Sequence, residues 1–143
     1  MTIRQISVFI SNSNGGMADV SDVIGKSGAD IRALSIADTT DFGILRLIVD
    51  DPKKAATALS EANYIVSVTE VLAAYIEDCP GGLAKAIRPL SDAGITIEYA
   101  YAFVSRLNDN AYVVLRVDDN DQAEKILTEN GVRLASPEEV YKI

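Results

Sequence analysis

Two short glycine-containing segments have the composition of a recognition site for a small charged molecule. The first is Asn12-Ser13-Asn14-Gly15-Gly16-Met17, and the second is Asp78-Cys79-Pro80-Gly81-Gly82-Leu83. A pair of glycines lets the backbone turn sharply and approach a ligand closely. The helix expected after each pair would point free N–H groups at the ligand, which favours a carboxylate or a phosphate. The side chain of Asn12 or Asp78 could then hold an amine.

A plainer interpretation of both segments stays open. The glycines would only make a tight turn between a strand and a helix, and the polar residues would only cap the helix. Cys79 lies just before an expected helix start, a position that can make a thiol reactive. Because no base lies near it in the sequence, we expect an ordinary thiol.

The composition removes most catalytic and metal-binding chemistry. The chain of 143 residues has no histidine and one cysteine, so a Ser-His or Cys-His pair and a cysteine-based metal site are excluded. The acidic pairs Asp50-Asp51 and Asp118-Asp119 precede expected helices and are interpreted as helix caps rather than metal ligands. We therefore predict no catalytic residue, no metal and no cofactor.

The charge balance narrows the possible partners. The formal net charge is −8, whereas nucleic acids and anionic membranes are bound through clustered Lys and Arg. The N-terminal residues are not followed by the apolar core of a signal peptide, and the longest uncharged apolar run, residues 71–76, is too short to span a bilayer. We expect a cytoplasmic protein that binds neither nucleic acid nor membrane.

An internal repeat organises the chain. The separation in sequence between Gly16 and Gly82 is the same as the separation between Gly28 and Gly94. Such a constant offset indicates duplicated structural units. The repeat predicts two modules, residues 1–69 and residues 70–143, with no Gly-, Pro- or Ser-rich linker between them.

Hydrophobic periodicity predicts the same element order in both modules. In the first module, strands are expected at residues 3–10, 30–37, 44–49 and 64–68, and helices begin near Met17 and at Pro52. In the second module, strands are expected at residues 71–76, 95–103, 111–117 and 132–134, with helices over 83–93 and 121–130 and a short helical turn from Ser136. The order is a split βαβ unit. We predict an α+β fold of two tandem ferredoxin-like βαββαβ modules, with antiparallel sheets and helices packed on one face.

Three local features sharpen this expectation. Residues 39–43 are interpreted as a hairpin turn, and Asn108-Asp109-Asn110 as its counterpart. Pro89 predicts a kink or an early stop of its helix near residues 87–88. Alternating side chains of the strands expected at residues 30–37 and 95–103 are interpreted mainly as core packing under the helices; they are Ile31, Ala33, Ser35 and Ala37, and Tyr99, Tyr101 and Phe103.

The second glycine segment, the helix after it and Ala93-Gly94-Ile95-Thr96-Ile97 resemble the signature of the ACT domain. The resemblance covers nearly the whole chain as two tandem copies. In the first copy, Asn12 and Asn14 stand where the signature has Asp and Pro. ACT domains are small regulatory modules of amino-acid metabolism that commonly pair at their edge strands.

The resemblance implies an amino-acid effector pocket between paired modules, closed by the start of a strand from the neighbouring module. The residues that it places there are Asn12, Asn14, Gly15, Gly16, Met17, Asp30, Ile31, Asp78, Cys79, Pro80, Gly81, Gly82, Leu83, Thr96 and Ile97. It further implies a homodimer that acts as a non-catalytic sensor or regulatory protein, with any regulated metabolic enzyme on a separate chain. The alternative is a structural or assembly subunit of an enzyme complex that binds no ligand.

Overall fold

The structure is a computed structural model that describes residues 1–11, 14–38, 41–104 and 110–142. It divides into two compact units, and we describe each by itself. The N-terminal unit is Arg4–Thr69, and the C-terminal unit combines Glu70–Ile143 with Met1–Ile3.

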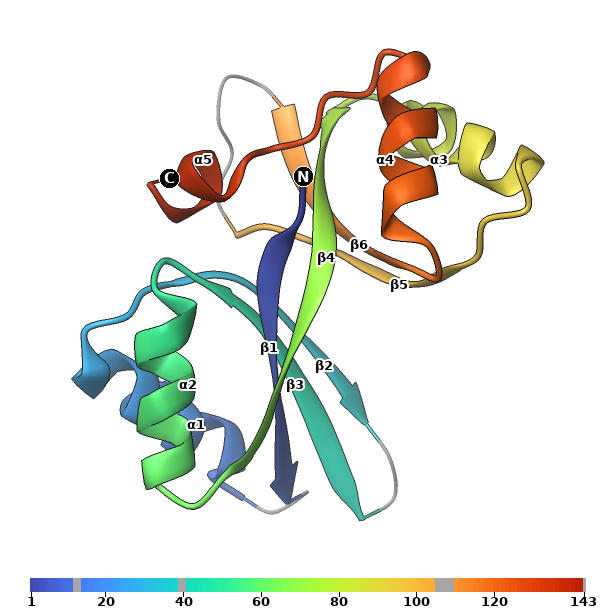
Figure 1. The fold of residues 1–143 in the computed structure, drawn as a ribbon. Helices are drawn as coiled ribbons and strands as arrows, with labels where there is room; N and C mark the ends of the chain where they lie inside the picture. The colour runs from blue at the N-terminus through green and yellow to red at the C-terminus, as the bar shows by residue number, and fades with distance from the viewer. Residues whose placement is uncertain (12–13, 39–40, 105–109, 143) are drawn as a thin grey trace. The chain divides into compact units, whose positions relative to one another are not determined.

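The N-terminal unit has the predicted element order (Figure 1). Its elements are β1 (Ile3–Ser11), α1 (Gly16–Ser27), β2 (Ile31–Asp38), β3 (Phe42–Val49), α2 (Pro52–Glu61) and the beginning of β4 (Ile65–Glu77). The strand order is β2-β3-β1-β4, and β3 pairs antiparallel with both of its neighbours.

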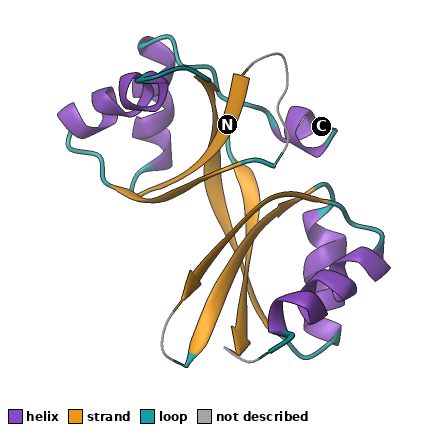
Figure 2. Cartoon of the chain, turned by 180° about the vertical axis from the view of Figure 1, so that it is seen from behind, coloured by secondary structure: helices purple, strands orange, loops and turns teal. Residues whose placement is uncertain are grey.

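The C-terminal unit repeats this order with a reduced sheet. It contains the end of β4, α3 (Gly82–Asp92), β5 (Ile97–Ala102), β6 (Asn110–Val117), α4 (Asn120–Glu129) and α5 (Pro137–Tyr141). The strand order is β4-β6-β5, with antiparallel pairing. Figure 2 shows helices against one side of the strands in each unit. The predicted α+β fold of two tandem βαββαβ modules is confirmed.

Four local expectations differ from the structure. The strands expected at 64–68 and 71–76 form one continuous strand, β4, and the last expected strand is reduced to a single bridge between Leu134 and Ala74. Phe42 and Gly43 belong to β3 rather than to a turn; Thr39, Thr40, Asn108 and Asp109 lie outside the described residues. Of the two outcomes predicted at Pro89, a kink or an early stop, the early stop does not occur, because α3 continues to Asp92. Burial of Ala86 and Leu90 on either side of Pro89 stabilises the helix through this position.

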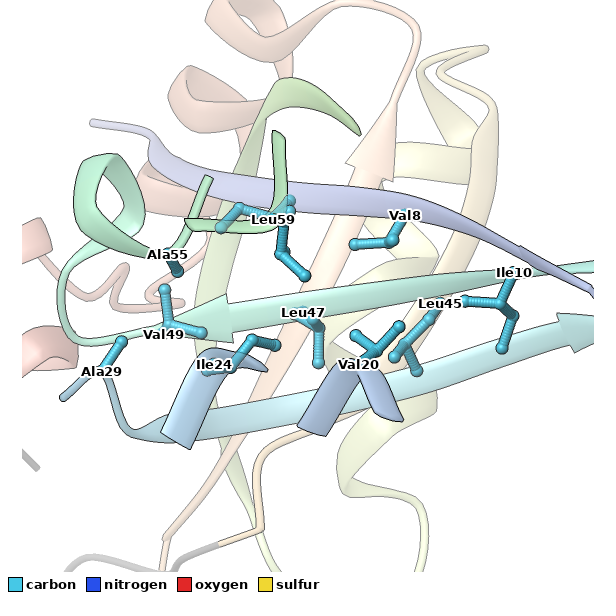
Figure 3. Close-up of a cluster of buried hydrophobic side chains, with 11 residues drawn as sticks. Val8, Ile10, Val20, Ile24, Ala29, Leu45, Leu47, Val49, Ala55 and Leu59 are labelled. Atoms are coloured by element: carbon cyan, nitrogen blue, oxygen red, sulfur yellow. The ribbon is translucent and has the colours of Figure 1, made fainter. Parts of the chain in front are cut away.

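Each unit buries one apolar cluster between its helices and its strands. Figure 3 shows the cluster of the N-terminal unit, in which Val20 and Ile24 of α1 and Leu59 of α2 pack on Leu45 and Leu47 of β3. The C-terminal cluster uses equivalent positions: Val20 and Ile24 correspond to Ala86 and Leu90, while Leu47 and Leu59 correspond to Leu115 and Leu127. The offset between the copies is larger after the β2–β3 hairpin than before it. The duplication therefore kept the core across a change in the length of the hairpin.

Among the side chains expected under the helices on β2 and β5, Ile31 packs on the core cluster, whereas those that follow a register shift lie on the other face of the sheet. A register shift follows Ile31 in β2, so Ala33 pairs with Ile48, and not with the core residue Leu47. The same irregularity follows Ile97 in β5, where Tyr99 and Tyr101 pair with residues that alternate with Leu115 of the core. Because the bulge exchanges the two faces of the strand, the core-packing interpretation is wrong for Ser35, Ala37, Tyr99 and Tyr101. It is confirmed for Ile31, and Ala33 and Phe103 are buried.

Candidate functional site

The glycine pairs Gly15-Gly16 and Gly81-Gly82 adopt the same conformation at the start of a helix. Gly15 and Gly81 have φ values of +90° and +81°, a left-handed conformation that only glycine adopts without strain. Gly16 and Gly82 begin α1 and α3, where the backbone passes close to the end of the preceding strand. A Cβ on Gly16 would lie 2.9 Å from the carbonyl oxygen of Ser11, and one on Gly82 would meet the Glu77 carbonyl still more closely. The turn itself requires both glycines of each pair.

The turn in the C-terminal unit uses some of the N–H groups that were expected to face a ligand. The Gly82 N–H donates to the carbonyl of Cys79 at 3.0 Å, and the Cys79 N–H donates to the carbonyl of Glu77 at 2.9 Å. The Cys79 thiol is exposed and donates to Glu77 Oε2 at 3.9 Å. The Gly82 N–H, one of the backbone donors at the start of a helix that were expected to face a carboxylate, is therefore already engaged.

Most of the other expected contact residues are open to solvent. Asn12 lies outside the described residues. Met17 and Leu83, the apolar residues that follow the glycine pairs, expose 42% and 47% of their surface. The remaining loop residues are exposed too; they are Asn14, Gly15, Asp78, Pro80 and Gly81.

Two cavities flank α3, and each is lined by one or two of the residues that were expected to contact a ligand. One cavity, of about 300 Å³, contains Gly82, and its other lining residues are Tyr75, Ile76, Glu77, Lys85, Ala86, Asn130, Gly131 and Val132. We call it the loop cavity. The other, of about 550 Å³, contains Thr96 and Ile97, and its other lining residues are Ala84, Ile87, Arg88, Ser91, Gly94 and Ile95. We call it the strand cavity. Gly82 of the loop and the strand start at Thr96 and Ile97 thus line different cavities.

The strand cavity has the chemistry of a site for a small carboxylate. Arg88 forms no ion pair with any acidic side chain in the part of the chain that the structure describes. Ser91 and Thr96 add hydroxyl groups, and isoleucines 87, 95 and 97 supply apolar walls. Sequence reasoning missed Arg88 and Ser91. Their spacing from Ala84 and Ile87 along one face of the helix was the available signal.

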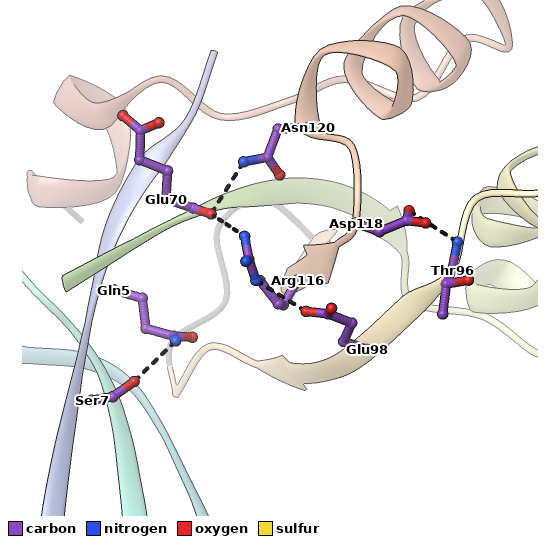
Figure 4. Close-up of polar contacts among 8 residues, drawn as sticks. All are labelled: Gln5, Ser7, Glu70, Thr96, Glu98, Arg116, Asp118 and Asn120. Carbon is purple, nitrogen blue, oxygen red and sulfur yellow. Dashed lines mark hydrogen bonds and ion pairs between the residues drawn. The ribbon is translucent and has the colours of Figure 1, made fainter. Parts of the chain in front are cut away.

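Two aspartates fix the strand starts that were expected to contact a ligand. Asp118 Oδ1 accepts the N–H of Thr96 at 3.2 Å, as Figure 4 shows, and the Asp118 N–H donates to the Thr96 carbonyl at 3.3 Å. Asp50 and Asp30 repeat this clamp at 2.7 Å and 3.1 Å. The backbone N–H and carbonyl groups of Asp30 and Thr96 are therefore engaged, so a ligand there would have to be contacted by their side chains.

The second aspartate of each acidic pair caps a helix, as predicted. Asp51 accepts the N–H of Lys54 at 3.1 Å, and Asp119 accepts the N–H of Gln122 at 3.0 Å. No group of three or more potential metal ligands occurs among the described residues. Among the helices within the described ranges, none has the length and apolarity needed to cross a membrane.

Tyr75 connects the loop cavity to the C-terminal helix. Its hydroxyl accepts a hydrogen bond from Tyr112, and the guanidinium of Arg133 lies 4.4 Å from its ring centroid. Arg133 forms an ion pair with Glu139 of α5, and the predicted capping box at Ser136 is present. Burial and the bond to Tyr75 raise the pKa of Tyr112, while the Ser136 N–H lowers the pKa of Glu139. These contacts hold α5 against β4 and β6.

Comparison with solved structures finds a full-length match at clear sequence similarity. A protein from Bacteroides thetaiotaomicron is 38% identical, with a TM-score of 0.93 over 100% of this chain and 98% of that one. The regulatory subunit of aspartate kinase from Thermus thermophilus, in its ligand-free form, is 15% identical, with a TM-score of 0.63 over 89% of this chain and 91% of that one. Its counterpart from Thermus flavus is 16% identical, with a TM-score of 0.60 over 90% of each chain.

The two aspartate kinase subunits share the fold of this chain. Because their sequence identities are low, the similarity supports a common fold and not a common function. A comparison with curated proteins returned no match. The whole sequence, residues 1–143, matches the family described as the ACT domain pair. The chain belongs to the ACT domain pair family.

Proposed function

We propose that the protein is a non-catalytic regulatory protein of amino-acid metabolism that senses a small amino acid. The observation that carries this proposal is the strand cavity, in which an unpaired cation, two hydroxyl groups and apolar walls surround a volume of about 550 Å³. Ligand sites of this volume commonly combine apolar walls with a few convergent polar groups. In the proposal, Arg88 binds the α-carboxylate, and Ile87 and Ile97 contact the ligand side chain.

The two modules differ at this cavity, which favours the C-terminal module as the binder. By the offset of the glycine pairs, the residues of the first module that correspond to Arg88, Ser91 and Thr96 are Asp22, Gly25 and Asp30. A carboxylate thus replaces the guanidinium, and a second carboxylate replaces a hydroxyl group. Like charges repel at short range, so an amino-acid carboxylate is disfavoured at the first position.

An ammonium group needs an acceptor, and the strand cavity offers only hydroxyl oxygens among its described side chains. In a homodimer, the glycine loop of a second copy would supply Asp78 as the acceptor. The ligand would then stabilise one quaternary arrangement over another, which is the physical basis of a sensor. An enzyme regulated in this way is a separate polypeptide in the proposal, and cytoplasm is the compartment that the single cysteine favours.

A thermal-shift screen against the twenty amino acids and common 2-oxo acids tests the proposal. A ligand at 100 times its Kd stabilises the folded state by about 2.7 kcal/mol. The thermal stabilisation by a true ligand should be lost in Arg88→Gln and retained in Lys85→Gln. The control removes a positive charge from the same helix, but Lys85 lines the loop cavity and not the strand cavity. A folded protein that no compound stabilises would contradict the proposal and favour the assembly-subunit alternative.

A further inference from the structure

A separate cavity of about 420 Å³ lies on the N-terminal unit beside α2. Its lining residues are Arg4 of β1, Pro52, Lys53, Ala56 and Thr57 of α2, and Val68 of β4. We call it the α2 cavity. Every one of these residues belongs to the N-terminal unit, so the cavity does not depend on any other part of the molecule.

The α2 cavity carries two positive charges that nothing in the described structure neutralises. Arg4 and Lys53 form no ion pair or hydrogen bond through their side chains with any described residue. Asp51, the nearest acid in the sequence, already caps α2 through the N–H of Lys54. The chain has 21 acidic and 13 basic residues, so most cations have an abundant choice of partners. Two unpaired cations lining one cavity make a local positive site in a negatively charged protein.

The remaining lining residues suit the carbon skeleton of a small organic anion. Val68 exposes 52% of its surface although it is apolar, and Ala56 and Pro52 continue this apolar floor. Thr57 adds a hydroxyl donor. Pro52 occupies the first turn of α2 and has no N–H to offer a ligand.

The duplicated position in the C-terminal unit has the opposite charge. The counterparts of Arg4, Lys53 and Ala56 in the second copy are Glu70, Asp121 and Glu124. There, the chain's own N-terminal ammonium pairs with Glu124. The second copy of this position therefore carries acidic residues in place of the basic ones. The first copy presents basic residues with no partner, and an anion is the corresponding occupant.

We propose that the α2 cavity is a binding site for a small organic dianion, a short dicarboxylate, which is distinct from the amino-acid site. The negative charges are met by Arg4 and Lys53, and the carbon skeleton lies over Ala56 and Val68. A phosphate group would satisfy the same cations, so the experiment compares the two sources of charge.

Isothermal titration of the full-length protein with malonate, succinate and inorganic phosphate tests this site. Sodium chloride is added so that all titrations have the same ionic strength, because a difference in screening alone would change weak interactions between charges. We expect saturable binding of a dicarboxylate that is at least about tenfold tighter than that of phosphate, and a Kd that rises about tenfold or more in Lys53→Gln and in Arg4→Gln. Lys54→Gln is the matched control: it removes the same charge from the next residue, whose side chain does not line the cavity, and its Kd should change less than twofold.

Three results would overturn the proposal. The first is the absence of saturable dicarboxylate binding in the presence of chloride. The second is a loss of affinity in Lys54→Gln as large as that in Lys53→Gln. The third is tighter binding of phosphate than of either dicarboxylate. If a glutamine variant is poorly folded, Lys53→Arg and Arg4→Lys keep the charge and must retain binding. Arg88→Gln should leave this binding intact, so failure of the amino-acid site and failure of the dianion site give different patterns.

Discussion

Replacing Gly82 by alanine should destabilise the C-terminal unit much more than replacing its neighbour Gly81. At Gly81, an added Cβ meets nothing within 4 Å, so the cost is that of the left-handed conformation, about 1 kcal/mol. At Gly82, the Cβ would overlap the carbonyl oxygen of Glu77 and lie 3.2 Å from its carbonyl carbon. Backbone atoms cannot rotate away as the end of a side chain can, so the turn must open.

The size of the Gly82 effect follows from what the turn loses. Opening it breaks the hydrogen bond from the Gly82 N–H to Cys79, about 1 kcal/mol. Strain of the kind caused by overpacking adds about 1 to 3 kcal/mol. Alanine regains up to about 1 kcal/mol of helix propensity. These contributions sum to about 1 to 4 kcal/mol for Gly82→Ala, with a midpoint of about 2.5 kcal/mol, against about 1 kcal/mol for Gly81→Ala.

Urea unfolding followed by circular dichroism measures the two free energies. Amide hydrogen exchange should accompany it, because two units can unfold separately and a single transition need not describe the whole chain. The lost protection should be confined to α3 and the neighbouring strands. If the two variants differ by less than about 0.5 kcal/mol, the close approach to Glu77 is not what requires glycine at this position. A Gly82→Ala protein of normal stability that no longer binds an amino acid would instead assign this glycine to the ligand.

Three further predictions concern contacts within single units. Asp118→Ala should lower the urea midpoint by the equivalent of about 1 kcal/mol, since it removes the acceptor of the Thr96 N–H; an unchanged midpoint would show that the clamp contributes nothing. Pro89→Ala should raise stability by about 1 kcal/mol because it restores a helical N–H donor, and a loss of stability would mean that the ring packs usefully. The pKa of Glu139 is lowered in the folded protein, so its contribution is present above the ordinary glutamate pKa and is lost as the pH falls through the folded value. The protection factors of the α5 amides, which correct for the intrinsic pH dependence of exchange, should therefore fall at acidic pH in the wild type and in Glu138→Gln, and be low at all pH values in Glu139→Gln.

The element order was predictable because it depends on local patterns. Apolar spacing identifies α1 and α3, Asp51-Pro52 marks the start of α2, and the glycine pairs mark the turns. Each of these signals acts within a short stretch of the chain. The positions of these helices and turns can therefore be predicted from local sequence without knowing which strands pair.

The faces of β2 and β5 could not be predicted in the same way. Alternation states which side chains share a face, but a bulge after Ile31 or Ile97 exchanges the faces, and pairing with a neighbouring strand determines where a bulge lies. The reduction of the last expected strand of the second module to a single bridge also depends on contacts between distant residues. Residues near Leu134 make one bridge to Ala74 and then turn into α5, which Arg133 and Glu139 hold by a long-range contact that the sequence pattern does not indicate.

Comparison of the two modules separates residues that maintain the fold from residues that recognise ligands. The glycine pairs, the aspartate clamps and most core positions recur in both copies, as expected for groups that every copy of the fold needs. The cavity residues do not recur: Arg88 corresponds to Asp22, and Lys53 corresponds to Asp121. A reversal of charge at a solvent-exposed position changes stability little, but it changes the sign of the charge that a cavity attracts. The family's glycine signature therefore explains the turn, while the cavities beside α2 and α3 are where ligand specificity is expected to differ between the modules.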